Sequence, residues 1–200
     1  MIFFTADLHI GHANIIKYCA RPYRTVGEMD SMLIMNWNAK VNEDDTVYVL
    51  GDMFFNSRSE PEKLLERLNG KKHLILGNHD NVWMKHMDVS RYFDDVAPMV
   101  VIPYAKQTYL LTLCHYLMMC YSGDRKGSGY MIHGHIHNRT DEEFFPLIRS
   151  NPYILNAGVD VNDFKPVTFE ELLKNNKKFK KTAVKTSAKQ PTWEDEEYDE

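Results

Sequence analysis

Histidine, aspartate and asparagine side chains follow five short apolar runs of this sequence, each just beyond the point where a run ends. The runs cover residues 2–6, 46–50, 73–76, 109–114 and 130–133. The polar side chains that come after them are Asp7, His9, Asp52, Asn78, His115, His135 and His137. All seven offer oxygen or nitrogen atoms, and imidazole with carboxylate suits Mn²⁺, Fe and Zn²⁺ alike. The residues therefore predict a metal site without choosing the metal; we favour Mn²⁺, with Fe or Zn²⁺ as the other candidates.

The number of these ligands indicates more than one metal ion. A single catalytic zinc keeps only about three protein ligands, so the set is too large for one open site. If one carboxylate is shared, the same set supplies two ions with four protein ligands each. Two ions about 3.5–4 Å apart clamp the attacking and leaving oxygens of an in-line displacement. The residues therefore predict a binuclear site that transfers a phosphoryl group to water.

The apolar runs predict the strands that position these ligands. Continuous apolar runs of this length are typical of strands buried on both faces. A sixth run, residues 153–155, leads into Asn156-Ala157-Gly158-Val159-Asp160, and residues 100–104 and 108–113 form a predicted hairpin. Because loops converge beyond the carboxyl ends of strands in layered α/β folds, we expect the ligands to meet there.

Helical patterns lie between the strand-like runs. Residues 29–37 carry apolar side chains at helical spacing. Ser59-x-x-Glu62 and Thr168-x-x-Glu171 have the pattern of a helix capping box ahead of an apolar stretch. Strands and helices alternate and then give way to adjacent strands, so the sequence predicts a layered α/β protein with a mixed sheet.

The composition is that of a globular protein, with 200 residues of which 44% are hydrophobic. This length suits one domain. No apolar run reaches the roughly 18 residues that span a membrane, and residues 1–7 lack the basic leader of a signal peptide. Three cysteines, an odd number, suit a reducing compartment. We therefore expect a cytoplasmic protein that does not contact a membrane.

The charge is spread unevenly along the chain. A formal net charge of −4 argues against a protein held to nucleic acid by bulk electrostatics, so nucleic acid is expected only as a substrate. Residues 174–190 hold seven lysines and no acid, and residues 191–200 hold six acids and no base. Residues 1–173 carry 17 basic and 22 acidic side chains, a net −5. We predict a folded domain over residues 1–173 and a charged, flexible tail over residues 174–200.

Five sequence blocks carry a resemblance to a known family. The blocks are Asp7-Leu8-His9, Gly51-Asp52, Gly77-Asn78-His79-Asp80, His115 and Gly134-His135-Ile136-His137. In this order they closely resemble the calcineurin-like metallophosphoesterase family. The segment from residue 7 to residue 18, with Arg21-Pro22, is also similar to a small bacterial and phage branch of that family. The resemblance implies a four-layer α/β/β/α sandwich with mixed β-sheets, and it identifies residues 1–173 as a metallophosphoesterase domain.

The resemblance also implies a role for each predicted ligand. The first metal ion would be held by Asp7, His9, Asp52 and His137. The second would be held by Asp52, Asn78, His115 and His135. Asp52 would then bridge the two ions, and a bridging hydroxide is the expected nucleophile. A bound divalent cation lowers the pKa of water from 15.7 toward about 7, so hydroxide exists at neutral pH.

Two further residues of the resemblance are expected to take part in catalysis. His79 would lie over the phosphate and donate to a phosphoryl oxygen or protonate the leaving group. Asp80 would orient His79 from a position outside the ligands, as carboxylates commonly do for catalytic histidines. No position of the family pattern is missing, which argues against a relative that has lost its activity.

Candidates for substrate contact follow the first ligand loop. His12, Asn14 and Arg21 could meet a phosphate or a base edge. Asn14 could instead cap a turn, and Arg21 could be a solvated loop charge. Tyr116 and Tyr121, just past His115 in the sequence, could stack on a base or pack on the core.

The remaining histidines have simpler interpretations. His133 lies inside an apolar run and is expected to be structural, and His73 and His86 belong to no motif. Cys114, next to His115 in the sequence, is expected to be a small buried apolar residue and not a ligand.

The predicted function is metal-dependent hydrolysis of a phosphate ester. We favour a phosphodiester or nucleotide substrate, because a small body without a recognisable cap domain suggests an open site. A phosphomonoesterase or protein phosphatase is the alternative. A nuclease would need a basic, aromatic-lined groove, for which a body charge of −5 gives little support. A non-catalytic binding module that keeps metals for stability is the remaining hypothesis.

Overall fold

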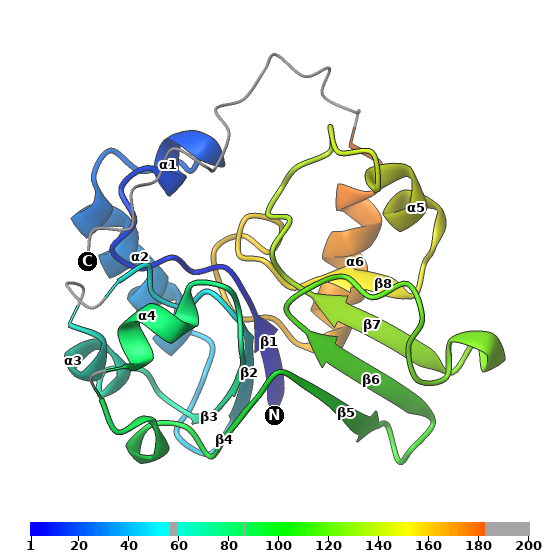
Figure 1. Ribbon diagram of the computed structural model, residues 1–200, viewed down its shortest axis with the longest axis horizontal. Coiled ribbons are helices and arrows are strands. Elements are labelled where there is room, and N and C mark those ends of the chain that lie inside the picture. The colour runs from blue at the N-terminus through cyan, green and yellow to red at the C-terminus, as the bar shows by residue number, and fades with distance from the viewer. Residues whose placement is uncertain (57–59, 86, 183–200) are drawn as a thin grey trace.

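Two four-stranded sheets stack on one another in the computed structural model, which describes residues 1–56, 60–85 and 87–182 (Figure 1). The first sheet is parallel throughout, and its strands, in spatial order, are β1 (Ile2–Thr5), β2 (Thr46–Leu50), β3 (Lys71–Ile75) and β4 (Asp95–Ala97). The short apolar runs at β1 to β3 became strands as predicted. Strand β4 was not predicted, because its three residues, Asp-Val-Ala, form no apolar run.

The second sheet contains the mixed pairing that the sequence predicts. Its strands are β5 (Met99–Tyr104), β6 (Tyr109–Cys114), β7 (Gly129–His133) and β8 (Ile154–Asn156). Strands β5 and β6 form the predicted hairpin, with Tyr104 opposite Tyr109. Strands β6, β7 and β8 are parallel, so their carboxyl ends point the same way.

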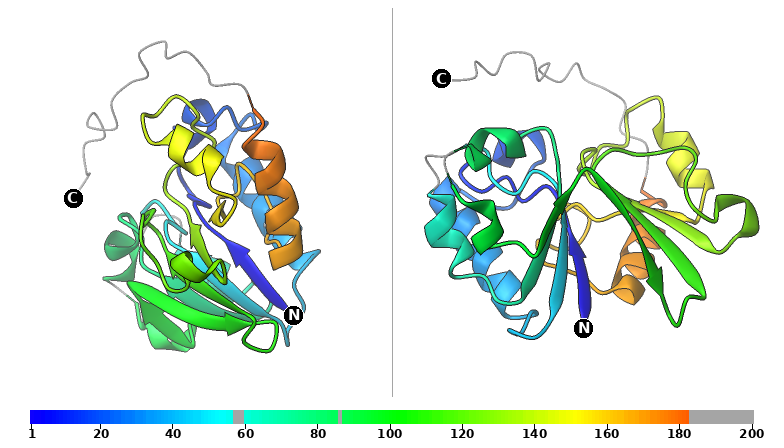
Figure 2. Two further views of the ribbon diagram at one scale, coloured as in Figure 1. Left: turned by 90° about the vertical axis from the view of Figure 1, so that its right-hand side faces the viewer. Right: turned by 60° about the horizontal axis from the view of Figure 1, so that its bottom comes forward.

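Helices cover the outer face of each sheet. The first sheet carries α1 (Ile15–Tyr18), α2 (Val26–Asn38), α3 (Pro61–Leu65) and α4 (Asp80–Met84), and Figure 1 shows α2, α3 and α4 on the side away from the second sheet. Helix α5 (Phe145–Ser150) covers the second sheet, and α6 (Phe169–Phe179) runs beside β1 and β8 (Figure 2). Short 3₁₀ turns occur at Val89–Arg91 and Asp124–Lys126.

The buried residues confirm the four predicted layers. Trp37 of α2, with no exposed surface, packs with Val47 in the core between the helices and the first sheet. Phe4 and Leu113 share the core between the two sheets. Met131 packs with Ile148 of α5 on the outer face of the second sheet. The architecture is therefore the predicted α/β/β/α sandwich.

Two predicted helix starts have different outcomes. Helix α6 begins with the predicted capping box, in which Thr168 and Glu171 exchange side chain-to-backbone hydrogen bonds. Helix α3 has Glu60 at its N-cap and Pro61 at its first position, so it does not begin at the box predicted from Ser59. Proline fits that first position because its missing N–H has no partner there. Ser59 itself lies outside the described residues.

The packed body extends past the predicted boundary at residue 173. Helix α6 continues to Phe179, and Asn176 and Phe179 are buried on the same face as Leu172. The lysines of this segment hid the continuing helical spacing of buried positions. Residues 183–200 of the predicted tail lie outside the described residues, as does His86. Within the described chain, no helix has the length and apolar character needed to cross a bilayer.

Candidate metal centre

The loops after the strands bring the predicted ligands to one edge of the sandwich. Asp7 follows β1, Asp52 follows β2 and His115 follows β6. Hydrogen bonds join the first two loops, since the N–H of Asp7 donates to Gly51 O at 3.1 Å and the N–H of His9 donates to Asp52 O at 3.0 Å. The parallel strands therefore position the ligands as the sequence predicts.

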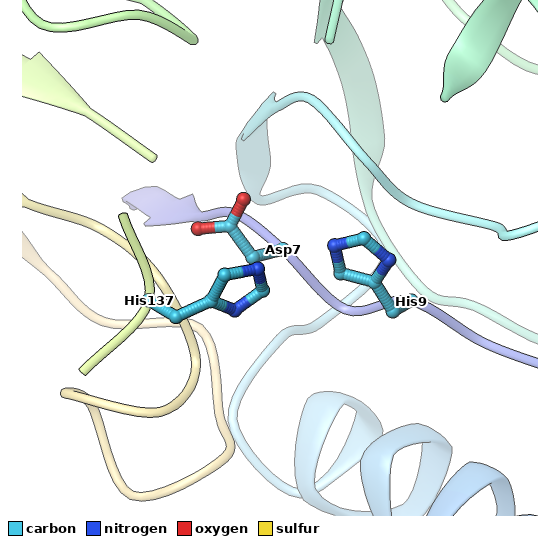
Figure 3. A group of neighbouring side chains, drawn as sticks. All are labelled: Asp7, His9 and His137. Carbon is cyan, nitrogen blue, oxygen red and sulfur yellow. The ribbon is translucent and has the colours of Figure 1, made fainter. Parts of the chain in front are cut away.

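One group of ligand atoms combines Asp7, His9 and His137 (Figure 3). One ligand atom from each of the three lies within 4.8 Å of the others. The side chains are almost fully buried, and the His9 and His137 rings are 5.0 Å apart between centroids. Asp7 and His9 come from the loop after β1 and His137 from the loop after β7, so the two sheets contribute to the same group.

The chemistry of this group fits a divalent cation. Oδ2 of Asp7 and both ring nitrogens of His9 are buried without a hydrogen-bond partner among the described residues. Leaving such atoms unsatisfied costs about 1–3 kcal/mol each. Burial raises the pKa of the Asp7 carboxyl and lowers the pKa of His9 well below its ordinary value. A cation would stabilise the carboxylate and accept the imidazole lone pair.

A second group combines Asp52, His115 and His135, and it opens to solvent at His135. Nε2 of His115 lies 3.2 Å from Oδ2 of Asp52 and 3.1 Å from Oδ1 of Asn78. Nδ1 of His115 lies 2.8 Å from Leu50 O. Because a carbonyl only accepts, Nδ1 carries the proton, and Nε2 faces the other ligands.

Burial and charge act in opposite directions on this second group. Burial disfavours the charged His115 ring, but the hydrogen bond and charge of Asp52 outweigh it and raise the pKa of His115 to about 9. Burial also opposes ionisation of Asp52, and His115 holds its pKa below the ordinary value. Burial lowers the pKa of the less buried His135 to about 4.

Asp52 connects the two groups. Its Oδ2 is 3.2 Å from Nε2 of His115 and 3.6 Å from Nε2 of His9. Its other oxygen, Oδ1, accepts the backbone N–H of His79 at 3.0 Å. One carboxylate oxygen therefore faces ring nitrogens of both groups.

The ligand loops adopt a backbone conformation that is uncommon for residues other than glycine. The five ligands with a positive φ, between 49° and 69°, are Asp7, His9, Asp52, His135 and His137. Residues held in this left-handed region cost free energy and cluster at functional sites. The strained residues therefore lie in the loops that carry the two candidate ligand groups.

Two glycines allow the ligand loops to approach each other. A Cβ on Gly77 would lie 2.2 Å from Oδ1 of Asp52, and a Cβ on Gly51 would lie 2.4 Å from Nδ1 of His115. No side chain fits at either position without moving a ligand. The glycines of the Gly51-Asp52 and Gly77-Asn78 blocks are thus explained by close packing.

His79 lies beside the first ligand group. Its ring is 5.2 Å from the His9 ring and 5.5 Å from the Phe55 ring, measured between centroids. The side chain is half-buried, and His79 stands at the N-cap of α4. The structure therefore brings His79 to the ligands.

The hydrogen bonds of Asp80 go to groups other than the His79 ring. Oδ2 accepts the N–H groups of Asp52 and Gly77 at 3.0 and 2.8 Å. Oδ1 accepts the N–H of Met53 at 3.1 Å and Nε1–H of Trp83 at 2.9 Å. These four donors occupy the buried carboxylate, which therefore fixes the loop of Asp52 and does not orient the His79 ring.

Of the three candidates for substrate contact, His12 is buried and Asn14 is exposed. His12 is 3% exposed and stacks on Phe55 at 3.8 Å between centroids, with an interplanar angle of 10°. Burial lowers the pKa of His12 to about 3, so the ring is neutral. Asn14 is exposed at the N-cap of α1 and its side chain makes no capping hydrogen bond.

Arg21, the third candidate, is buried, which argues against the predicted contact with substrate. It is 4% exposed, and its donors go to Asp160, to the carbonyls of Asp7 and Leu8 and to Sδ of Met29. The sequence offered no signal for this burial, because its carboxylate partner lies 139 positions away.

Asp160 is a buried residue at the site that sequence reasoning missed. It lies in the loop after β8, and its Oδ2 is 2.9 Å from Nδ1 of His137. The sixth apolar run leads into this loop just as the other five lead to ligands. That position was the available signal, and no role was assigned to it.

The other aromatic residues divide between site and scaffold. Tyr116 is 47% exposed and its ring lies 4.9 Å from the His135 ring. Tyr121 packs against the outer core of the second sheet instead. His133 is fully buried, as expected for a structural residue, and Cys114 packs on that same outer core. His73 pairs with Asp95 at the surface.

Comparisons with known proteins find relatives that span most of this chain. The family model described as calcineurin-like phosphoesterase matches residues 1–198. An uncharacterized protein of Methanocaldococcus jannaschii is 38% identical over 176 residues, which cover 86% of this chain and 89% of that protein. The Gene 66 protein of Mycobacterium phage D29 is 30% identical over 198 residues, covering 83% of this chain and 92% of the phage protein.

A solved structure has the same fold. A protein of unknown function from Aquifex aeolicus superposes with a TM-score of 0.66 at 26% identity, covering 87% of this chain and 98% of that one. The fold therefore recurs in a protein of nearly the same length.

Proposed function

The chain belongs to the calcineurin-like phosphoesterase family, and on that premise we propose that it hydrolyses a phosphate ester at a site that holds two divalent cations. The observation that carries the proposal is the position of Asp52, whose Oδ2 faces Nε2 of His9 at 3.6 Å and Nε2 of His115 at 3.2 Å. A carboxylate between two ligand groups is the arrangement that a shared ligand requires.

Each cation would have its own ligands besides Asp52. Those of the first would be Asp7, His9 and His137. Those of the second would be Asn78, His115 and His135. Such a pair of cations supplies charge to neutralise the phosphate and lowers the pKa of water toward neutrality. We favour Mn²⁺, because nitrogen and oxygen ligands without a thiolate suit it, with Fe and Zn²⁺ as the other candidates.

His79 would act on the substrate directly. It lies beside His9, and its backbone N–H is tied to Oδ1 of Asp52, so its position is fixed relative to the ligands. From there the ring could donate to a phosphoryl oxygen or to the leaving group. Phe55 and His12 pack behind it and form an apolar, neutral support. Asn14, exposed near this loop in the sequence, is kept as a candidate substrate contact.

We favour a phosphodiester or nucleotide over a monoester. The described elements all belong to the two sheets and their flanking helices, and the second ligand group is exposed at Asn78 and His135. Tyr116 presents an exposed ring beside His135, where an aromatic base could stack. An open site beside an exposed tyrosine ring suits a substrate that carries an organic group on each side of the phosphate.

A substrate panel tests this proposal. The metal-free protein would be loaded with Mn²⁺, Zn²⁺ or Fe²⁺ and assayed on bis- and mono-nitrophenyl phosphate and on cyclic nucleotides. We expect Mn²⁺-dependent turnover, with diesters hydrolysed faster than monoesters. Faster monoester hydrolysis would move the assignment to a phosphomonoesterase or protein phosphatase. Bound metal without turnover on any ester would indicate a binding module and refute the proposed activity.

A further inference from the structure

We propose that Asp160 and Arg21 are positioning residues that hold His137 in the orientation required for metal binding. The inference rests on the proposed function, because it concerns a ligand of the first cation. Neither residue reaches the substrate, since the side chains of both have no exposed surface.

Asp160 fixes the ring of His137 by a direct hydrogen bond. Its Oδ2 accepts from Nδ1 of His137 at 2.9 Å. A proton held at Nδ1 directs the lone pair of the imidazole to Nε2, which is the atom a cation needs. The same bond sets the rotation of the ring and makes Nε2 more basic.

Arg21 in turn fixes the carboxylate of Asp160. Nε of Arg21 donates to Oδ1 of Asp160 at 2.8 Å, and Nη2 donates to Oδ2 at 3.0 Å. The two residues therefore form a bidentate ion pair. The buried guanidinium therefore holds the carboxylate in place to accept the N–H of His137.

The remaining donors of Arg21 tie this pair to the first ligand loop. Nη2 also donates to the carbonyl of Asp7, and Nη1 donates to the carbonyl of Leu8, each at 2.7 Å. Nη1 further contacts Sδ of Met29 at 3.4 Å. One guanidinium thus joins the loop after β1, which carries Asp7 and His9, to the loop after β8, whose Asp160 holds His137.

A separate metal site at this place is less consistent with the contacts. Sγ of Cys19, a ring nitrogen of His137 and an oxygen of Asp160 lie within 4.8 Å of one another, as ligands of a cation could. However, both oxygens of Asp160 already accept hydrogen bonds, and the buried guanidinium lies against them. A cation at this place would meet the positive charge of Arg21, so positioning is the better interpretation.

Metal titration of variants tests the inference without relying on turnover. Asp160→Asn keeps the volume of the side chain and removes its charge. Asp45→Asn is a matched control, because Asp45 is also buried and ion-paired, to the N-terminal amine of Met1 at the start of β1. Mn²⁺ affinity and stoichiometry would be measured on metal-free protein by calorimetry, and electron paramagnetic resonance would distinguish coupled from isolated ions.

We expect Asp160→Asn to weaken one of the two Mn²⁺ sites by roughly 10–100-fold, the usual effect of losing such a partner. The coupled signal should give way to that of an isolated ion, while Asp45→Asn keeps both sites. Wild-type affinity at both sites in folded Asp160→Asn would overturn the inference. Arg21→Lys keeps the positive charge but loses the bidentate hydrogen bonds to Asp160, so it should weaken the same Mn²⁺ site. Unchanged Mn²⁺ binding in this variant would also contradict the inference.

Failure of the proposed function gives a different result. If the wild type binds two ions and hydrolyses no ester, the activity is refuted while the loss of one site in Asp160→Asn still supports the positioning role. If the wild type binds no divalent cation, both are overturned.

Discussion

Oδ2 of Asp52 lies 3.6 Å from Nε2 of His9, so the group of Asp52, His115 and His135 meets the group of Asp7, His9 and His137. The same oxygen is 3.2 Å from Nε2 of His115 in its own group. His9 follows β1 in the first sheet and His115 follows β6 in the second. The candidate centre is therefore assembled across both sheets, and its parts depend on a single carboxylate.

Removing the shared carboxylate charge should abolish hydrolysis. Asp52→Asn keeps the shape of the side chain but removes the negative charge that two cations would share. We therefore expect turnover to fall by about 10³-fold or more, a loss of roughly 4 kcal/mol of transition-state stabilisation. His135→Ala should have an effect of the same order. Steady-state assays with Mn²⁺ and circular dichroism of the variants would check this, and substantial metal-dependent turnover in folded Asp52→Asn would refute the assignment.

His79 should matter most where the leaving group is poor. If it protonates the leaving oxygen, His79→Ala should slow alkyl esters by about 10²–10⁴-fold and activated aryl esters far less. Comparing kcat for the two classes of ester measures the difference. Equal losses on both classes would show that the ring acts only on the phosphoryl oxygens.

Gly77 should be required for the position of Asp52. A Cβ there would lie 2.2 Å from Oδ1 and 2.7 Å from the backbone nitrogen of Asp52, so Gly77→Ala should displace the ligand and weaken Mn²⁺ binding. Gly27 is the matched control, because no atom lies within 4 Å of a Cβ placed on it in helix α2. Gly27→Ala should keep metal binding and stabilise the fold by up to about 1 kcal/mol, as measured by thermal unfolding. Equal metal affinity in the two variants would contradict the packing argument.

The metal-free protein should lose stability in acid through His133. Burial lowers the pKa of His133 to about 4, against 6.5 for an ordinary histidine, so the unfolded state binds more protons between these values. The stabilisation is complete above pH 6.5 and is lost as the pH falls toward 4.

Thermal unfolding from pH 7 to pH 4 checks this contribution. The melting temperature of the wild type should fall more steeply than that of His133→Asn, which cannot take up a proton. His73→Asn is the control, since His73 is only partly buried and pairs with the exposed Asp95. Parallel curves for wild type and His133→Asn would show that His133 is not responsible.

The sequence predicted which side chains come together at the site because their signal is local. Polar side chains follow the ends of the buried strands, so the end of each apolar run marked a candidate ligand such as Asp7 or Asp52. Parallel strands placed those ends together. The capping box at Thr168 is equally local, with both partners within one turn.

The contacts that the sequence did not predict join residues far apart in the chain. Arg21 meets Asp160 across 139 positions, and Asp80 bonds to Asp52 across 28. Nothing near Arg21 in the sequence distinguishes a solvated charge from a buried ion pair. Which backbone amides donate to Asp80 depends on how the loops after β2 and β3 pack, and only the folded chain defines that packing.

Activity measured against the number of bound ions tests the central claim most directly. Metal-free protein would be titrated with Mn²⁺ while hydrolysis of bis-nitrophenyl phosphate is followed. A binuclear site predicts that turnover rises with added metal and reaches its maximum at two ions per chain. Full turnover at one ion per chain, or no turnover at any metal concentration, would contradict the account.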